Sequence, residues 1–508
     1  MSTYYFVGSG IAALAGAVYL IRDAGVDGRD IVLLEESADF GGALDAHGSA
    51  DSGYFMSGSR MFESEYRCTF DLLAAIPSGA KPLISARDET SHVEGTIAEF
   101  HHLGLDERER ADLLTLVMEP ERLLDGKRIT DRFTPGFFQS PFWYDWCTLF
   151  AFAPWHSAIE FRRYLLRFMH HASTIATEED VNRAHFNPYD SIALPIVAWL
   201  KEHGTTIRFE TTVVDLEFKA DVSEAITVAA IVTTSGGVPA TLALGASDIV
   251  FVTNGSMTAD TAFGSMDAAP VLNRCKQSGA WRLWETLARG RPEFGHPAVF
   301  DDHIDESGWS SFSVTVTDPR FLERIETFTG SVPGRGGLTT FNDSNWLITI
   351  AIFHQPFFPA QPAGVDVWWG YGLYHDQPGN YVKKPMSDCT GREILEEVLG
   401  HLHFDSDTAA ILDSSTVIPC VMPYITSQFL VRSSGDRPRV VPAGSTNLAF
   451  IGQYAELPDE VVFTVEYSIR SAQLAVYTLL GVKKPTIPMD KGMHDPRVVF
   501  AALETAQR

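Results

Sequence analysis

The first residues along the chain that could do chemistry form a glycine-rich turn, Gly8-Ser9-Gly10-Ile11-Ala12, between two apolar runs. Gly8 permits a tight turn, and Gly10 lets the backbone approach a pyrophosphate. The N-terminus of a following helix would offer free N–H groups and a positive dipole end to those phosphates. The spacing predicts a dinucleotide-binding turn that includes Ala12, with Ala13 where the usual pattern has a third glycine.

Two acids follow this turn at the distance that a dinucleotide site requires. The apolar run 31–34 predicts a second strand, and this strand ends at Glu35. An acid at this offset from the glycines binds the ribose hydroxyls in such sites. The neighbouring Glu36 is the alternative ribose ligand.

Two further glycine positions point to FAD rather than NAD. A Gly41-Gly42 turn follows the acids directly, as in many flavoproteins with a two-dinucleotide fold. Residues 447–452 then predict a strand that ends at Gly452, and residues 460–480 predict a helix. Such a late strand and helix resemble those that cap the flavin ring in these proteins. We therefore expect FAD, with Gly42 and Gly452 beside it.

The elements that must position the first turn read as a strand over 4–7 and a helix over 11–23. The same residues, from Tyr4 to Ile21, carry no charge, which also fits a membrane or secretory segment. Because no positively charged region precedes the run and Ser9 and small residues interrupt it, we favour a soluble strand–turn–helix unit.

Along the rest of the chain, strands and helices alternate without a linker or a repeat. Residues 62–200 read as mainly helical, residues 206–252 as β-rich, residues 310–375 as strands and loops, and residues 390–401 as a helix. We expect an α/β fold in which a discontinuous Rossmann-type FAD-binding domain is interleaved with a substrate-binding domain and mainly helical segments. The expected parts are an FAD-binding domain (1–60, about 206–260 and 440–482), a mainly helical part of the substrate site (about 61–205), a β-rich substrate-binding domain (about 261–439) and a C-terminal segment (483–508).

Composition limits the classes of partner. The chain of 508 residues has a formal net charge of −26, which repels phosphate backbones and makes nucleic acid an unfavourable partner. Its five cysteines show no C-x-x-C spacing, which argues for a reducing, cytoplasmic compartment. The pairs His101-His102 and His170-His171 invite a metal site, but adjacent side chains on a helix diverge and no carboxylate is spaced to join them, so we predict none.

Several motifs resemble those of the oleate hydratase family, once called myosin-cross-reactive antigens. They are spread over nearly the whole chain: Gly8-Ser9-Gly10-Ile11-Ala12, Leu33-Leu34-Glu35-Glu36, Trp155-His156-Ser157, Asn187-Pro188-Tyr189-Asp190-Ser191, Met422-Pro423-Tyr424-Ile425-Thr426 and Phe450-Ile451-Gly452-Gln453. The resemblance implies an FAD-dependent hydro-lyase. It would add water across an isolated cis double bond of a free unsaturated fatty acid such as oleate, giving a hydroxy fatty acid with no net redox change at the flavin.

The family's acid, a tyrosine that protonates the alkene, falls on Tyr164 in this sequence. A helix would place Arg163 and Arg167 beside it, and a nearby cation lowers the pKa of a phenol. Tyr189 is the competing tyrosine.

The family's water-activating glutamate is missing. Its loop reads Arg-Gly-Gly-Arg-Glu-Met-Glu, whereas residues 57–63 here read Ser-Gly-Ser-Arg-Met-Phe-Glu. Arg60 and Glu63 match the family, but Met61 stands where the glutamate belongs, and a thioether cannot accept a proton. Either Glu63 or Asp45 serves as the base instead, or water adds with little help.

The resemblance places capture of the substrate carboxylate on Thr426, Gln428 and Arg432. An arginine there could bind a carboxylate through two hydrogen bonds. The alternatives to a hydratase are a flavin oxidoreductase of the amine oxidase-like class and a non-catalytic protein that binds FAD or lipid. Because the family's dimers carry longer termini, we expect a monomer.

Overall fold

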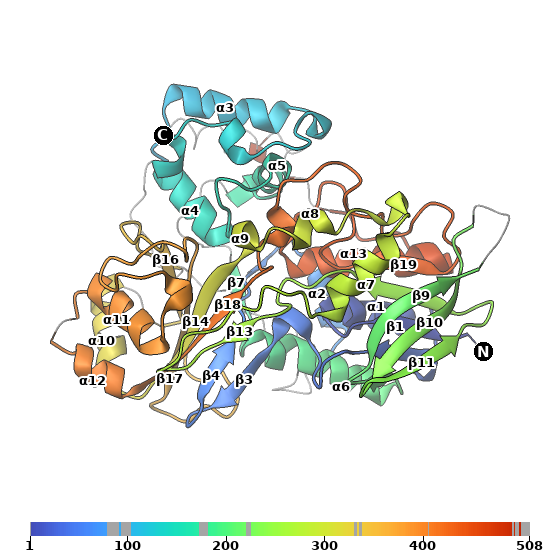
Figure 1. Cartoon of the computed structure of the whole chain (residues 1–508), viewed down its shortest axis with the longest axis horizontal. Coiled ribbons are helices and arrows are strands. Elements are labelled where there is room, and N and C mark those ends of the chain that lie inside the picture. The colour runs from blue at the N-terminus through green and yellow to red at the C-terminus, as the bar shows by residue number, and fades with distance from the viewer. Residues whose placement is uncertain are drawn as a thin grey trace.

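The computed structural model describes residues 2–78, 91–92, 103–171, 181–219, 225–329, 333–334, 338–404, 406–489, 492 and 497–498. A five-stranded sheet, all of whose paired strands are parallel, lies at one end of the molecule (Figure 1). Its strands, in spatial order, are β19 (Leu448–Ile451), β12 (Ile249–Thr253), β1 (Tyr4–Val7), β2 (Ile31–Leu34) and β8 (Thr206–Arg208). The sheet therefore has the Rossmann-type arrangement that the sequence predicts.

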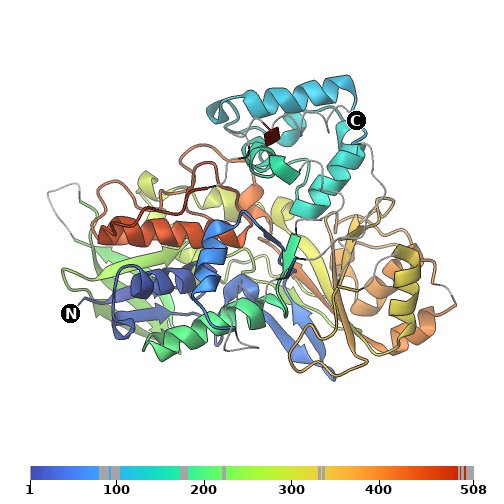
Figure 2. The ribbon, with the colours of Figure 1, turned by 180° about the vertical axis from the view of Figure 1, so that it is seen from behind.

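Helix α1 (Ile11–Arg22) packs against α13 (Val465–Leu480) and α6 (Leu194–Glu202) beside this sheet (Figure 2). Its residues 12–20 are all buried, because small side chains let it approach the sheet closely. Helix α13 begins at Val465, five residues later than predicted, since the side chain of Thr464 accepts a hydrogen bond from Tyr467 N and caps it.

The uncharged run at the N-terminus forms β1 and α1. Across the described residues, the structure contains no helix long and apolar enough to cross a membrane. All five cysteines are free thiols.

Two antiparallel sheets extend the fold. One joins β9 (Thr212–Phe218), β10 (Val228–Ser235) and β11 (Val238–Ala243). The other has the order β13 (Ala262–Phe263), β18 (Ser415–Met422), β14 (Trp309–Val316), β17 (Asp366–Gly372), β16 (Ile348–Ile352) and β15 (Thr339–Thr340). Every residue of β14 is buried, as expected of a strand covered on both faces.

Helices and a hairpin cover the six-stranded sheet. Helices α10 (Arg320–Thr329), α11 (Gly391–His401) and α12 (Thr408–Asp413) share an apolar core with it. The hairpin β3 (Ala46–Ser49) and β4 (Gly53–Met56) contacts β14 and β18. The prediction of a helix over 390–401 is confirmed, whereas α10 lies in a segment that we read as strands and loops.

The segment predicted to be mainly helical contains α2 (Arg67–Ala74), α3 (Glu107–Met118), α4 (Pro141–Phe150) and α5 (Ala158–Arg167). It also contains the short strands β5 (Phe62–Glu63), β6 (Ser91–His92) and β7 (Val181–Arg183), and a π-helical turn over Tyr189–Ala193. Three more helices, α7 (Gly279–Ala288), α8 (Ala298–Asp301) and α9 (Ile304–Ser307), follow β13. The domain boundaries stated above remain a prediction.

Candidate active site

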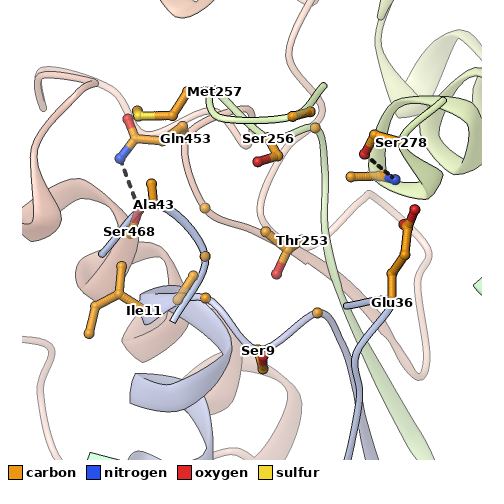
Figure 3. A pocket seen from close by; sticks show the side chains of 18 of the residues that line it. Ser9, Ile11, Glu36, Ala43, Thr253, Ser256, Met257, Ser278, Gln453 and Ser468 are labelled. Atoms are coloured by element: carbon orange, nitrogen blue, oxygen red, sulfur yellow. Dashed lines mark hydrogen bonds between the residues drawn. The ribbon is translucent and has the colours of Figure 1, made fainter. Parts of the chain in front are cut away.

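A cavity of about 630 Å³ opens at the carboxyl ends of the parallel strands. The turn after β1, the acids after β2, Thr253 at the end of β12 and Gly452 after β19 all line it (Figure 3). Ligands of open α/β sheets bind at this edge. The predicted cofactor residues Gly8, Gly10, Ala12, Glu35, Glu36, Gly42, Arg60 and Gly452 are brought together here.

The glycine turn is shaped to leave room for a ligand. Gly8 has a φ of +94°, a conformation that L side chains rarely adopt. Gly10 caps α1 without any side-chain hydrogen bond, and a Cβ atom built on it would meet no protein atom within 4 Å. Gly42, also at positive φ, lies against Gly10. The free N–H groups of α1 and the open space beside Gly10 fit a pyrophosphate.

The two acids hold different parts of the cavity wall. The Glu35 carboxylate accepts hydrogen bonds from Ser9 N at 2.8 Å and Ser9 Oγ at 2.6 Å, and so fixes the glycine turn. The Glu36 carboxylate accepts from Gly279 N at the start of α7. Burial raises the pKa of Glu36, and the bond from Gly279 opposes that shift. Glu36 therefore fixes the start of α7 to the cavity wall. The two residues are 243 positions apart, so no sequence motif could predict this contact.

Arg60 lines this cavity and also a second, much smaller one of about 20 Å³. Its guanidinium donates to Ala43 O at 2.8 Å and to Ser59 O at 3.1 Å. Burial lowers the pKa of Arg60, which Asp45 partly offsets. We call the second cavity the Arg60 cavity. Its polar lining residues are Ser59, Arg60, Arg183 and His354. Its other lining residues are Phe62, Ala184, Phe186, Pro188, Gly334, Ile352, Phe353 and Phe357.

Met61 lies between two residues that line the Arg60 cavity, Arg60 and Phe62. The Arg183 guanidinium approaches its sulfur at 3.7 Å. Neither Arg183 nor His354 was singled out by sequence reasoning, because each is a lone residue outside any motif.

Glu63, the candidate displaced base, is already engaged. Its carboxylate lies 2.5 Å from His171 Nε2, and Glu65 lies 3.1 Å from His170 Nε2. Burial disfavours the charge on His171, but the carboxylates of Glu63 and Glu65, which accept from its ring N–H, outweigh it and raise the pKa of that imidazole to about 10. A carboxylate held by a charged imidazole is a weaker acceptor for a water proton.

The expectation that no carboxylate joins His170 and His171 is wrong, because Glu65 brings a ligand atom within 4.8 Å of both. We assign the contact between Glu63 and His171, whose pKa is raised, as an ion pair. The other pair, His101-His102, lies outside the described residues.

This cluster predicts a pH dependence of stability. Because the pKa of His171 rises from 6.5 to about 10 on folding, its stabilising contribution is complete below pH 6.5 and is lost as the pH rises through about 10. We expect the denaturant midpoint of the wild type to decrease as the pH rises from 6.5 to about 10. The midpoint of His171→Gln should change less over the same pH range. Equal slopes in both proteins would contradict the ion-pair assignment.

Tyr164 is fully buried in α5, and its hydroxyl donates to Val462 O at 2.6 Å. The expectation of a lowered pKa is wrong. Burial raises the pKa of this phenol well above its usual value, and Tyr66, Glu160 and Glu460 add to the shift. The neighbouring cations do not help, because Arg163 and Arg167 are paired with other carboxylates. Its assignment as the acid remains a prediction.

Tyr189, the competing tyrosine, is half-buried on the π-helical turn. Its ring stacks on Phe40, and its hydroxyl donates to Asp39 at 3.1 Å. Burial and then Asp39 raise the pKa of this phenol. A Cβ atom on Gly41 would contact the ring at 3.5 Å, so Tyr189 sits beside the second glycine turn of the large cavity.

The three residues predicted to hold the substrate carboxylate are all buried. Thr426 Oγ1 donates to Ser307 O at 2.9 Å, and Gln428 donates to Ile425 O. Arg432 donates to Glu160 at 2.6 Å. Arg432 is thus paired with an internal carboxylate through Nε, while its buried Nη2 has no hydrogen-bond partner among the described residues. Its role as a ligand of the substrate carboxylate remains a prediction.

The Glu160 carboxylate pairs with two buried guanidiniums, that of Arg432 at 2.6 Å and that of Arg437 at 3.0 Å. We expect Glu160→Gln to lower the free energy of unfolding by about 3–5 kcal/mol, because it leaves buried cations without their carboxylate. The control is Glu306→Gln, which breaks an exposed pair with Arg128 and should change stability by about 0–1 kcal/mol. Equal denaturant midpoints for the two variants would contradict the account.

Comparison with known proteins adds to this geometry. A model of the MCRA family matches residues 2–477. An oleate hydratase from Streptococcus pyogenes serotype M49 (strain NZ131) is 39% identical over 503 residues, which cover 94% of this chain and 85% of that protein. A linoleate hydratase from Lactiplantibacillus plantarum is 31% identical over 547 aligned positions, covering 97% of this chain and 95% of that protein.

Two solved structures share the fold at low identity. An oxidoreductase from Methanosarcina mazei superposes with a TM-score of 0.52 and 11% identity, covering 94% of this chain and 100% of that one. A candidate protoporphyrinogen oxidase from Exiguobacterium sp. 255-15 superposes with a TM-score of 0.52 and 12% identity, covering 94% and 98%. At this identity the likeness extends to the architecture alone.

Proposed function

The chain belongs to the MCRA family, and from that premise we propose that it is a fatty acid hydratase, a hydro-lyase that adds water to an isolated cis double bond. The observation that carries the proposal is a pair of neighbouring cavities, both lined by Arg60: a large one whose glycine turns leave room for a dinucleotide, and a small, aromatic-lined one. Oleate and linoleate hydratases among its relatives indicate the substrate class, a free unsaturated fatty acid.

FAD is the proposed cofactor. Gly8, Gly10 and Gly42 would give its pyrophosphate room, and Glu35 is the proposed ligand of the ribose. Gly452 lines the same cavity close to Ala12. When bound, FAD would supply a planar ring that organises the site without net oxidation. Arg60, which is half-buried, contributes a positive charge to the lining of both cavities.

Hydration makes distinct demands on the protein. An alkene is a weak base, so an acid must protonate one carbon, and a base must help water bond to the other. The aromatic residues of the Arg60 cavity exclude bulk water, which limits side reactions. We propose Tyr164 as the acid, with Tyr189 as the alternative. Thr426, Gln428 and Arg432 remain proposed ligands of the carboxylate.

The proposal is tested by incubating the protein with oleic acid, with and without FAD, and analysing the products by mass spectrometry. We expect a product heavier by one water, formed faster when FAD is present. A product that has lost hydrogen would identify an oxidoreductase instead. Unchanged oleic acid, bound but not converted, would identify a non-catalytic lipid-binding protein, the outcome that Met61 in place of the family's glutamate would favour.

A further inference from the structure

The proposed reaction needs a group that accepts a proton from water, and the obvious candidates are not available. Met61 carries no basic atom, and Glu63 is held by His171. Asp45 is not among the residues that line either cavity. The base must therefore be sought among the polar residues that do line the Arg60 cavity.

The Arg60 cavity is the right size for a single water. A cavity needs roughly 10–15 Å³ of this kind of space to hold one water molecule, and about 20 Å³ is present. Its polar lining residues give a water the two to four partners that it needs. Of these, Arg60 and Arg183 stay protonated and the Ser59 hydroxyl is a very weak base. Only the imidazole of His354 can accept a proton near neutral pH.

The hydrogen bonding of His354 fixes its tautomer. Its Nε2 lies 2.8 Å from His185 O, and because a carbonyl oxygen only accepts, Nε2 must carry the proton. The Nδ1 atom of the neutral ring then keeps its lone pair. Among the described residues the ring makes no other hydrogen bond. Burial lowers the pKa of His354, the hydrogen bond to His185 O opposes this shift, and the side chains of His185 and Arg183 add to it. An imidazole whose pKa lies below its usual value of 6.5 is mostly neutral at pH 7.

The surrounding chain holds this ring in place. Gly334, at a φ of +77°, lies so close to His354 that a Cβ atom on the glycine would come within 2.4 Å of the histidine Cβ. Phe357 packs edge-on against the imidazole with ring centroids 5.8 Å apart. The imidazole is therefore presented to the cavity in a defined orientation, as a catalytic group requires.

We propose that His354 is the catalytic base of this chain and replaces the glutamate that Met61 displaces; the proposal rests on the proposed function. As the acid gives its proton to one alkene carbon, the water oxygen forms a bond to the other carbon. The water O–H bond then breaks, and its proton passes to Nδ1 of His354. Return of that proton through solvent to the acid restores both groups, so that one water is added in total and nothing is oxidised or reduced.

The test uses the full chain with saturating FAD and oleic acid. His354→Gln retains an N–H that can donate to His185 O but removes the basic nitrogen, so we expect the hydration rate to fall by about 10²–10⁴-fold with FAD affinity unchanged. The matched control is His375→Gln, because His375 is also half-buried with a lowered pKa and bonds Ser310, but is not among the residues that line either cavity. It should keep the wild-type rate.

A rescue distinguishes a base from a structural role. Adding Met61→Glu to His354→Gln returns the family's carboxylate to the site. We expect the double variant to hydrate oleic acid at least about tenfold faster than His354→Gln alone. Should His354→Gln not fold, His354→Asn takes its place in both comparisons. Near-wild-type hydration by the single variant, or no recovery in the double variant, would overturn the proposal. A wild type that does not hydrate oleic acid would instead remove the proposed function.

Discussion

Gly10→Ala should lower the affinity for FAD by at least about 100-fold, about 3 kcal/mol, while the protein stays folded. Gly10 has a φ of −71°, which alanine adopts without strain, and the added Cβ would meet no protein atom within 4 Å. The methyl group would instead occupy the space beside the N-terminus of α1, where we place the pyrophosphate. Fluorescence titration with FAD measures the loss, and circular dichroism checks the fold.

The matched control is Gly136→Ala. Gly136 has a φ of −63°, is exposed, and is not among the residues that line the large cavity. It should bind FAD like the wild type. If Gly10→Ala and Gly136→Ala bind FAD equally well, the cofactor does not lie against this turn and the site assignment is wrong.

Tyr164→Phe should reduce hydration of oleic acid by about 10²–10⁴-fold if Tyr164 is the acid. The change removes a single oxygen, so FAD binding should persist. It also leaves the buried Val462 carbonyl without its donor, which should cost about 1–3 kcal/mol of stability. Initial rates with saturating FAD, together with a denaturation curve, separate the catalytic loss from the structural one.

Tyr189→Phe is the paired comparison for this prediction. Its hydroxyl donates to the exposed Asp39, so the stability change should be small. Under our assignment this variant keeps most of its activity. A fully active Tyr164→Phe beside an inactive Tyr189→Phe would move the acid role to Tyr189, next to the second glycine turn.

The parallel sheet and its turns are the part of the fold that could be predicted from sequence, because their signals are local. An apolar strand, a glycine at positive φ such as Gly8, and a helix that begins directly after it occupy adjacent positions in the chain. Glu35, predicted as the ribose ligand, lies beside the turn and binds Ser9, and its role toward the ribose remains a prediction. By contrast, α10 was missed, although its two buried residues, Phe321 and Ile325, are spaced as on one face of a helix.

The parts that could not be predicted depend on residues far apart in sequence. Glu160 meets Arg432 and Arg437 across more than 270 residues, so an arginine that seemed free for a substrate is already paired. The cations beside Tyr164 fail to lower its pKa for the same reason, since their carboxylate partners come from distant segments. His354 belongs to no recognised motif, and only the fold shows that it faces the Arg60 cavity.

The central claim is that this chain adds water to an alkene, and the most direct test is to incubate it with oleic acid and FAD in H₂¹⁸O. Mass spectrometry of the product should show one ¹⁸O atom in a new hydroxyl group, with the double bond lost and the flavin spectrum unchanged at the end of the reaction. Incorporation of oxygen from O₂ instead of water, or net reduction of FAD with loss of substrate hydrogen, would contradict the account.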